Sequence, residues 1–185
     1  MLRNLLLILA SFLFLSQVMA EESANTAVST TTTPVTEPVV AVDTPMEVPY
    51  ISPVYEKTIK GDFNKIYQQV FTALENNGYF VVFEPNIGKQ LERFKQRWGD
   101  KYNKNQIENI RSMVFCNTWY ANEVSNQDPK LLALCPMHIT LTEKQGMVSL
   151  LYIRPSVVAK GSGAEKVALE IEQDVLRSIE EGLSR

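Results

Sequence analysis

Hydrophobic residues recur along this chain with two distinct spacings, and each spacing predicts one kind of element. Helical spacing, with apolar positions three and four residues apart, begins after Gly61-Asp62 and stops before Gly78. Its apolar positions are Phe63, Ile66, Tyr67, Val70, Phe71 and Leu74. The same spacing returns near the C-terminus at Ala164, Ala168, Ile171, Val175 and Ile179. Both segments therefore predict amphipathic helices with one face packed on a core.

A third amphipathic helix is predicted between Pro85 and Gly99, two residues that interrupt helices. Its apolar positions are Ile87, Leu91, Phe94 and Trp98. This stripe predicts that Trp98 packs in the core rather than lining a ligand pocket. The polar run Asp100–Asn109 predicts a loop, and a short helix is expected from Trp119 to about Gln127.

Alternating or short continuous apolar runs predict five strands. They span Val54–Ile59, Tyr79–Phe83, Ile110–Cys116, Pro136–Thr142 and Met147–Ile153. The second run has no polar position and predicts a strand that is buried on both faces or nearly so. The last two runs predict a hairpin joined by residues 143–146, with a polar face that includes His138.

The resulting order is strand, helix, strand, helix, strand, short helix, two strands and a final helix. An adjacent hairpin and a half-polar sheet face favour an α+β fold over a parallel α/β fold. We therefore expect one α+β domain over residues 53–185, a two-layer domain with a mostly antiparallel sheet covered by helices on one face.

The first twenty residues predict an export signal. Arg3 precedes an apolar run over residues 5–15, and Val18-Met19-Ala20 resembles a cleavage site. The run is shorter than the roughly 20 apolar residues of a spanning helix. No cysteine directly follows Ala20, so a bacterial lipid anchor is not indicated. We expect cleavage after Ala20, no stable membrane insertion afterwards, and a periplasmic or secreted protein.

Residues 21–52 are rich in threonine and proline and show no hydrophobic periodicity. Proline at this density disfavours helices and strand pairing, so the segment predicts a disordered tether before the domain. Its role as a plain spacer or as a docking segment is left open.

Charge limits the partners of the mature chain. Cleavage would leave 165 residues with 17 basic and 21 acidic side chains, a formal charge of −4. A mildly acidic domain without a basic stripe is a poor partner for nucleic acid. The same charge argues against docking on anionic lipid.

The chain has two cysteines, Cys116 and Cys135, and both follow the predicted cleavage site. An even cysteine count in an oxidising compartment favours a disulfide. Closing a loop of about 20 residues contributes roughly 3 kcal/mol in the chain-entropy model. Ligand-binding thiols and simple buried thiols are the alternatives. The pair forms no Cys-x-x-Cys motif, so thioredoxin-type chemistry and covalent haem attachment are not indicated.

Other chemistries have little support in the sequence. A hydrolase of the serine or cysteine type needs a nucleophile, a base and an orienting group. His138 is the only histidine, and no Gly-x-Ser-x-Gly motif is present. Gly161-Ser162-Gly163 precedes the last helix but lacks the lysine of a phosphate loop, so we interpret it as a capping loop. These features together favour a protein that is not an enzyme.

From Val54 to Leu183 the chain resembles a bacterial family known as domain of unknown function number 302. Three segments carry this resemblance: residues 76–82, Phe115-Cys116-Asn117 with Ala121, and residues 128–136. They are similar to the family's helix–glycine–strand segment, its Cys-Asn-Pro-x-x-Ala turn and its Asp-Pro…Leu-Leu-Pro-Cys stretch. The chain departs from the pattern at Thr118, where proline is frequent, and at Cys135-Pro136, where the order is reversed.

The resemblance implies a two-layer α+β domain that tends to form dimers and has no established activity. It also implies that relatives without a signal peptide carry the same two cysteines. Since cytosolic thiols are normally kept reduced, this points to a shared role in binding a metal, haem or a sulfur species.

Two functions are therefore expected from the sequence. The first is an exported, non-enzymatic binding or interaction module, a homodimer whose small ligand or envelope partner is unknown. The alternative is a redox, haem or transition-metal protein centred on the cysteine pair. The candidate cofactor-binding residues are Cys116, Asn117, Trp119 and Cys135. The candidate metal ligands are Cys116, Cys135 and His138. No resident cofactor is predicted.

Overall fold

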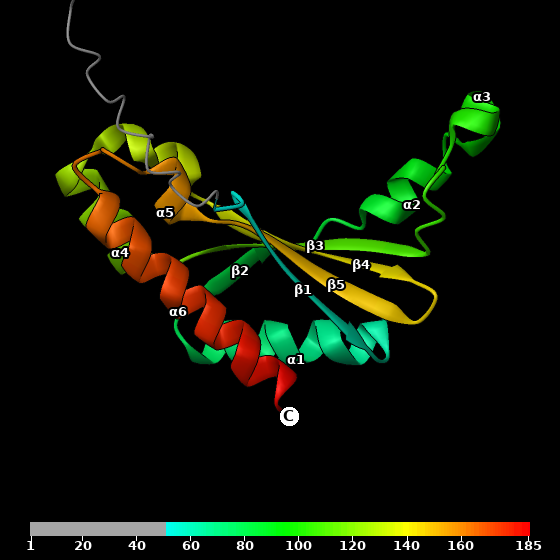
Figure 1. Ribbon diagram of the computed structural model, residues 1–185, viewed down its shortest axis with the longest axis horizontal. Coiled ribbons are helices and arrows are strands. Elements are labelled where there is room, and N and C mark those ends of the chain that lie inside the picture. Colours follow the sequence, from blue (N-terminus) through cyan, green and yellow to red (C-terminus); the bar gives the residue numbers. More distant parts are fainter. Residues whose placement is uncertain (1–50) are drawn as a thin grey trace, which may run out of the picture. The chain divides into compact units, whose positions relative to one another are not determined.

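The computed structural model describes residues 51–185, which form a five-stranded antiparallel sheet and the helices around it (Figure 1). The strand order is β1-β5-β4-β3-β2. The predicted signal peptide, residues 1–20, and nearly all of the predicted tether, residues 21–52, lie outside the described residues. Between residues 51 and 185, no helix has the length and apolar character needed to cross a membrane.

The strands occur where the hydrophobic pattern predicted them, with boundaries that shift by two residues at most. They are β1 (Val54–Lys60), β2 (Phe80–Phe83), β3 (Asn109–Cys116), β4 (Met137–Lys144) and β5 (Met147–Ile153). The α-helices are α1 (Phe63–Asn76), α2 (Ile87–Glu92), α3 (Lys95–Trp98), α4 (Thr118–Gln127), α5 (Pro155–Val158) and α6 (Glu165–Leu183). Two 3₁₀ helices are η1 (Gly99–Lys101) and η2 (Pro129–Leu134). The short elements α5, η1 and η2 were not predicted.

Consecutive strands β3, β4 and β5 form an antiparallel meander, and β1 joins its far edge against β5. Glu143 and Lys144 extend β4, so the hairpin connection has two residues rather than the predicted four. Gln145 and Gly146 have φ angles of 53° and 71°. Positive φ at both central positions matches the right-handed twist of the flanking strands and fixes the register of the hairpin.

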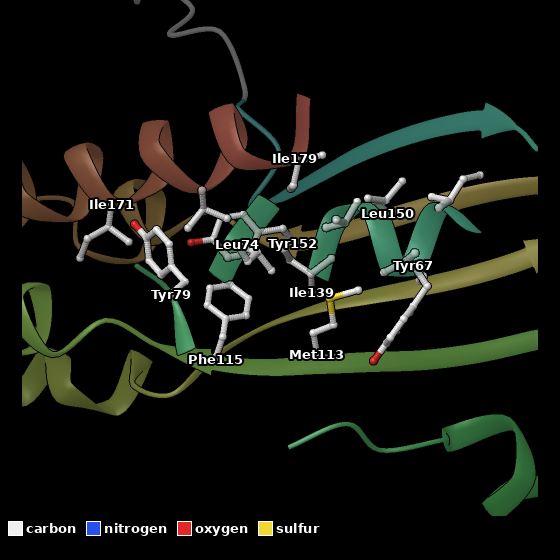
Figure 2. Close-up of a cluster of buried hydrophobic side chains, with 14 of the residues drawn as sticks. Tyr67, Leu74, Tyr79, Met113, Phe115, Ile139, Leu150, Tyr152, Ile171 and Ile179 are labelled. Carbon is white, nitrogen blue, oxygen red and sulfur yellow. The ribbon is translucent and has the colours of Figure 1, made fainter. Parts of the chain in front are cut away.

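The hydrophobic core lies between one face of the sheet and helices α1 and α6 (Figure 2). The strands contribute Met113, Phe115, Ile139, Leu141, Val148, Leu150 and Tyr152. The helices contribute the predicted stripes, with Ile66, Val70 and Leu74 on α1 and Ile171, Val175 and Ile179 on α6. An antiparallel sheet with α1 and α6 on one face confirms the predicted α+β class.

Strand β2 differs from its prediction. It was expected to be buried on both faces, yet Phe80, Val82 and Phe83 are 56%, 63% and 62% exposed. β2 pairs only with β3 and forms an edge of the sheet. Only Val81 of this strand packs against the core, while Tyr79, just before it, is fully buried. The continuous apolar run thus marks an exposed edge and not a central strand.

The predicted helix between Pro85 and Gly99 is also corrected. Two short helices, α2 and α3, replace it, and neither contains a buried residue. Trp98 is 39% exposed and stacks on Phe94 with ring centroids 5.0 Å apart. These apolar residues contact each other because α3 lies away from the core, as Figure 1 shows.

A buried carboxylate fixes the end of the sheet where β5 leads into α5. Glu172 of α6 is only 5% exposed. It accepts hydrogen bonds from the guanidinium of Arg154 at 2.5 Å and from the backbone N–H and the hydroxyl of Ser156. Because a buried carboxylate is costly unless it is paired, this cluster joins α5 to α6.

Candidate functional site

The two cysteines meet at one end of the sheet. Cys116 is the last residue of β3, and Cys135 follows η2 just before β4. Phe115 pairs with Met137 in the antiparallel register, so the residues beyond them lie at the same end of the two strands. Helices α4 and η2 reverse the chain between them, and the two Sγ atoms, both free thiols, are 3.2 Å apart.

The surroundings of Cys135 stabilise its protonated form. Burial, together with the hydrogen bond and the charge interaction with Cys116, raises the pKa of the Cys135 thiol to about 11. Only the thiolate acts as a nucleophile or as a metal ligand. Near neutral pH the thiol form of Cys135 therefore predominates, and this form is a poor nucleophile and a poor metal ligand.

Asn117 holds the start of α4. Its side-chain oxygen accepts a hydrogen bond from the backbone N–H of Tyr120 at 3.2 Å, and its amide nitrogen donates to the Gly78 carbonyl at 3.2 Å. Both polar ends of the side chain are therefore engaged. Asn117 is a helix cap that positions Cys116, rather than a free ligand group.

A small apolar cavity of about 30 Å³ lies beside Cys135, between α4, η2 and α6. Its wall includes Asn117, Cys135, Tyr120, Val124, Leu131, Leu134, Met137, Pro155, Ala168 and Ile171. Such a volume accommodates no more than about one water molecule or a methyl group. The apolar lining favours the latter.

A second cavity of about 120 Å³ adjoins the first. It is lined by Ala133, Leu134, Pro136, Met137, His138, Tyr152, Ile153 and Pro155. Leu134, Met137 and Pro155 line both cavities, so these side chains form the partition between them. Met137 also accepts a hydrogen bond from the Tyr152 hydroxyl, at 3.4 Å to its sulfur.

Two candidate residues from the sequence do not join the cysteines. Trp119 is 67% exposed and lines neither cavity. His138 is exposed on β4 and contributes to the second cavity, which Cys135 does not line. Across residues 51–185, no group of three or more His, Cys, Asp or Glu side chains is placed to hold a metal ion. The three-residue ligand set of Cys116, Cys135 and His138 is thus not assembled.

The residues that the sequence did not indicate come mainly from η2. Leu131 and Leu134 of η2 line the first cavity together with Ala168 and Ile171 of α6. The apolar run after Pro129 has no clear period, so it did not indicate an element. The backbone N–H of Gly161, which a bound anion would need, already donates a hydrogen bond to the Glu165 carboxylate of α6 at 2.8 Å.

Comparison with known proteins identifies the fold. The family described as "Domain of unknown function DUF302" matches residues 55–182. A solved structure of an uncharacterised conserved DUF302 protein from Bacillus stearothermophilus is similar, with a TM-score of 0.60 and 14% sequence identity. The similarity covers 71% of this chain and 98% of the other. No curated protein matches.

Proposed function

The chain belongs to the DUF302 family, and since this membership brings a fold without an activity, we propose that the protein is an exported, non-enzymatic binding module. Its binding site is the pair of cavities next to Cys135. The observation that carries this proposal is that an apolar cavity and a mainly apolar one share a wall formed by Leu134, Met137 and Pro155.

The ligand is a small apolar molecule. Methionine has three rotatable bonds and adapts readily to irregular spaces. Rotation of Met137 would join the cavity of about 120 Å³ to the cavity of about 30 Å³. An apolar cavity of about 150 Å³ is large enough for benzene. The sulfur of Cys135 and the ring of His138 would then lie at opposite ends of one binding space.

Benzene serves as the probe for this site. In protein labelled at its methionine methyl groups, benzene should shift the Met137 resonance saturably. Ala133→Phe should abolish the shift, because Ala133 is an exposed residue on the wall of the larger cavity. Val158→Phe, at an exposed site outside both cavities, should leave it unchanged. A shift that does not saturate, or one that persists in Ala133→Phe, would reject the proposed site.

Export is tested separately. The charged start, apolar run and Val18-Met19-Ala20 support cleavage after Ala20. Protein recovered from a secreting host should begin at Glu21 and reside in the periplasm or the medium. Soluble cytoplasmic protein that retains Met1 would contradict export without affecting the cavity experiment.

A second candidate function is a redox or haem- or metal-binding protein centred on Cys116 and Cys135, which the 3.2 Å separation of their sulfurs favours. Transfer of two electrons and two protons to an oxidant of the compartment would join the two Sγ atoms in a disulfide. The intact mass of the exported protein should then be two hydrogens below the reduced value. A Soret band or a thiolate-to-metal band in the purified protein would instead support cofactor binding.

Dimer formation is part of the proposal. Phe80, Val82 and Phe83 are exposed on β2, whose outer edge has no strand partner within residues 51–185. Unpaired strand edges are ready templates for pairing with a second chain. A second copy of this chain, placed antiparallel along β2, would cover these side chains.

A further inference from the structure

Residues 87–106 form a segment that we call the basic arm, comprising α2, α3, η1 and the turns that follow. In Figure 1, α2 and α3 extend away from the sheet on the side opposite α1 and α6. No residue of the arm is buried. The arm carries six basic and two acidic side chains in a chain whose net charge is −3. Its basic residues are Lys89, Arg93, Lys95, Arg97, Lys101 and Lys104.

A cation is followed by an aromatic residue three times along the arm, at a spacing of four residues. The pairs are Arg93-Phe94, Arg97-Trp98 and Lys101-Tyr102. The rings of Phe94 and Trp98 stack with an interplanar angle of 16°, and Lys95 Nζ lies 5.9 Å from the centre of the Tyr102 ring. The stack holds two large apolar rings in place although both are about 40% exposed, at 41% and 39%.

Most of the positive charge of the arm lies outside the groove that separates the arm from β3. A groove of about 730 Å³ runs between α2, the loop after η1 and the start of β3. Its charged lining residues are Lys89, Glu92, Lys95 and Glu108, which balance one another. Arg93, Arg97, Lys101 and Lys104 lie outside this lining, with Asp100 as the single acidic residue among them. A small anion in the groove would gain little, whereas an extended anionic surface would meet the excess charge.

We propose that the basic arm docks the protein on the surface of an anionic lipid bilayer. Arginine and lysine side chains would contact lipid phosphates, and Phe94 and Trp98 would enter the boundary between headgroups and acyl chains. Peripheral helices combine these same features, with cations on the polar side and tryptophan, phenylalanine or leucine on the other. The aromatic side chain of tryptophan is favoured at this depth because its ring is apolar and its N–H is polar.

Local charge explains why the net charge of the chain does not prevent docking. Surface charges are screened over about 8 Å at physiological salt, and the arm extends from the rest of the described domain (Figure 1). The acidic side chains elsewhere therefore act weakly on lipid that touches the arm. The mutual stacking of Phe94 and Trp98 occupies one face of each ring, which leaves fewer ring faces for the bases of single-stranded nucleic acid.

The proposal is independent of the apolar cavities, and the experiment uses residues 21–185 so that the predicted signal cannot bind lipid itself. All residues of the hydrophobic core lie in the part that is retained. The protein is sedimented with vesicles of phosphatidylglycerol and phosphatidylcholine, and with vesicles of phosphatidylcholine alone. We expect binding to the anionic vesicles, at least about tenfold weaker binding to the neutral ones, and loss of binding at about 0.5 M salt.

Two sets of variants locate the contact. R93E/R97E should weaken binding to anionic vesicles at least about tenfold. K160E/K166E, a matched pair of exposed cations at the α5–α6 end of the domain, should bind like the parent. In a W119F background, the emission of Trp98 should shift to shorter wavelength on binding. Circular dichroism of each variant confirms that it is folded.

Several results would overturn the proposal. One is equal binding to neutral and anionic vesicles, and another is unchanged binding of folded R93E/R97E. Trp98 emission that does not shift while protein sediments would place the contact elsewhere. Tighter binding of a single-stranded deoxythymidine oligonucleotide than of anionic vesicles would assign the arm to nucleic acid instead. If the chain proves to be cytoplasmic, the vesicle result still stands and only the membrane face concerned would change.

Discussion

Glu172 is buried and Cys135 is partly buried, and the state of each depends on its immediate neighbours. The Glu172 carboxylate has three donors from Arg154 and Ser156. The Cys135 thiol has the sulfur of Cys116 and an apolar cavity. The neighbours of Glu172 stabilise its charged form, whereas those of Cys135 stabilise its neutral form. Glu172 should therefore be sensitive to loss of its charge, and Cys135 to a pH high enough to ionise it.

Replacing Glu172 with glutamine should destabilise the domain by about 3 kcal/mol, the lower end of what breaking a buried ion pair costs. The lower end applies because the Arg154 side chain is 25% exposed and can regain some water. Chemical denaturation measures the free energy of unfolding. Glu170→Gln, an exposed change on the same helix, should alter it by less than about 0.5 kcal/mol. Equal stability of the two variants would show that the Glu172 cluster is not important for folding.

Alkylation of Cys135 in the reduced protein should depend steeply on pH. Its pKa is raised from an ordinary 9.0 to about 11, so iodoacetamide should label it slowly at pH 8 and with a midpoint near 11. Since the raised pKa belongs to the folded state, the stability it contributes is complete below about pH 9 and is lost as the pH rises through about 11. Peptide mass spectrometry reads the label. A midpoint at or below 9 would contradict this environment.

At the scale of elements, the helices and strands could be predicted wherever a local pattern and the tertiary contacts agree. The stripes of α1 and α6 and the β4–β5 hairpin are examples, because their spacing is the direct result of one buried face. The position of β2 at an edge of the sheet could not be predicted, since an apolar run does not reveal whether a strand has one neighbour or two. Around α2 and α3, Phe94 and Trp98 stack on each other, and neither helix contains a buried residue, so the apolar spacing there did not mark a core-facing stripe.

The candidate site was predictable only in part, where residues close in the sequence are also close in space. Cys116, Asn117 and Cys135 flank α4 and η2, so their proximity follows from the reversal of the chain. The first cavity was not predictable, because Ala168 and Ile171 reach it from α6, more than thirty residues further along the chain than Cys135. Trp119 lies outside both cavities, and the sequence could not show this because an aromatic residue next to a turn does not indicate which way its ring points.

The crossing of α1 and α6 provides a test at this scale. A Cβ atom at Gly182 would lie 2.9 Å from Val70 Cα and 3.0 Å from the Gln69 carbonyl oxygen. Alanine in place of a helical glycine normally stabilises by roughly 0.5–1 kcal/mol, but here the backbone of α1 blocks it. We expect Gly182→Ala to lower the thermal midpoint, with a net cost of about 1–2 kcal/mol. Glu170→Ala on the exposed side of α6 is the control, and a stabilised Gly182→Ala would disprove the close crossing.

For the whole molecule, the edge strand β2 and the basic arm are two exposed surfaces of different chemistry. β2 presents three large apolar side chains, whereas the arm presents cations and aromatic rings. The first suits a second copy of the chain, and the second suits an anionic surface. A dimer formed through β2 would carry two arms, and two attachments bind more strongly than one when both can reach the same surface.

Light scattering should give about twice the monomer mass for the mature chain. Phe83→Lys should convert it to a monomer, because a charge on an edge strand opposes pairing with another strand. Val158→Lys, at another exposed apolar position, should remain dimeric. A parent protein that is monomeric at tens of micromolar would exclude this dimer.

The pairing of β1 with β5 also determines when the sheet can be completed. Val54 lies opposite Ile153, and Lys60 lies opposite Met147. β1 has no other strand partner in the described domain. It can therefore pair only after β5, which lies about ninety residues further along the chain, has been synthesised. Contacts between residues so distant in sequence slow folding, because a long loop must close first. The native sheet therefore closes only after β5, its last strand along the chain, is available.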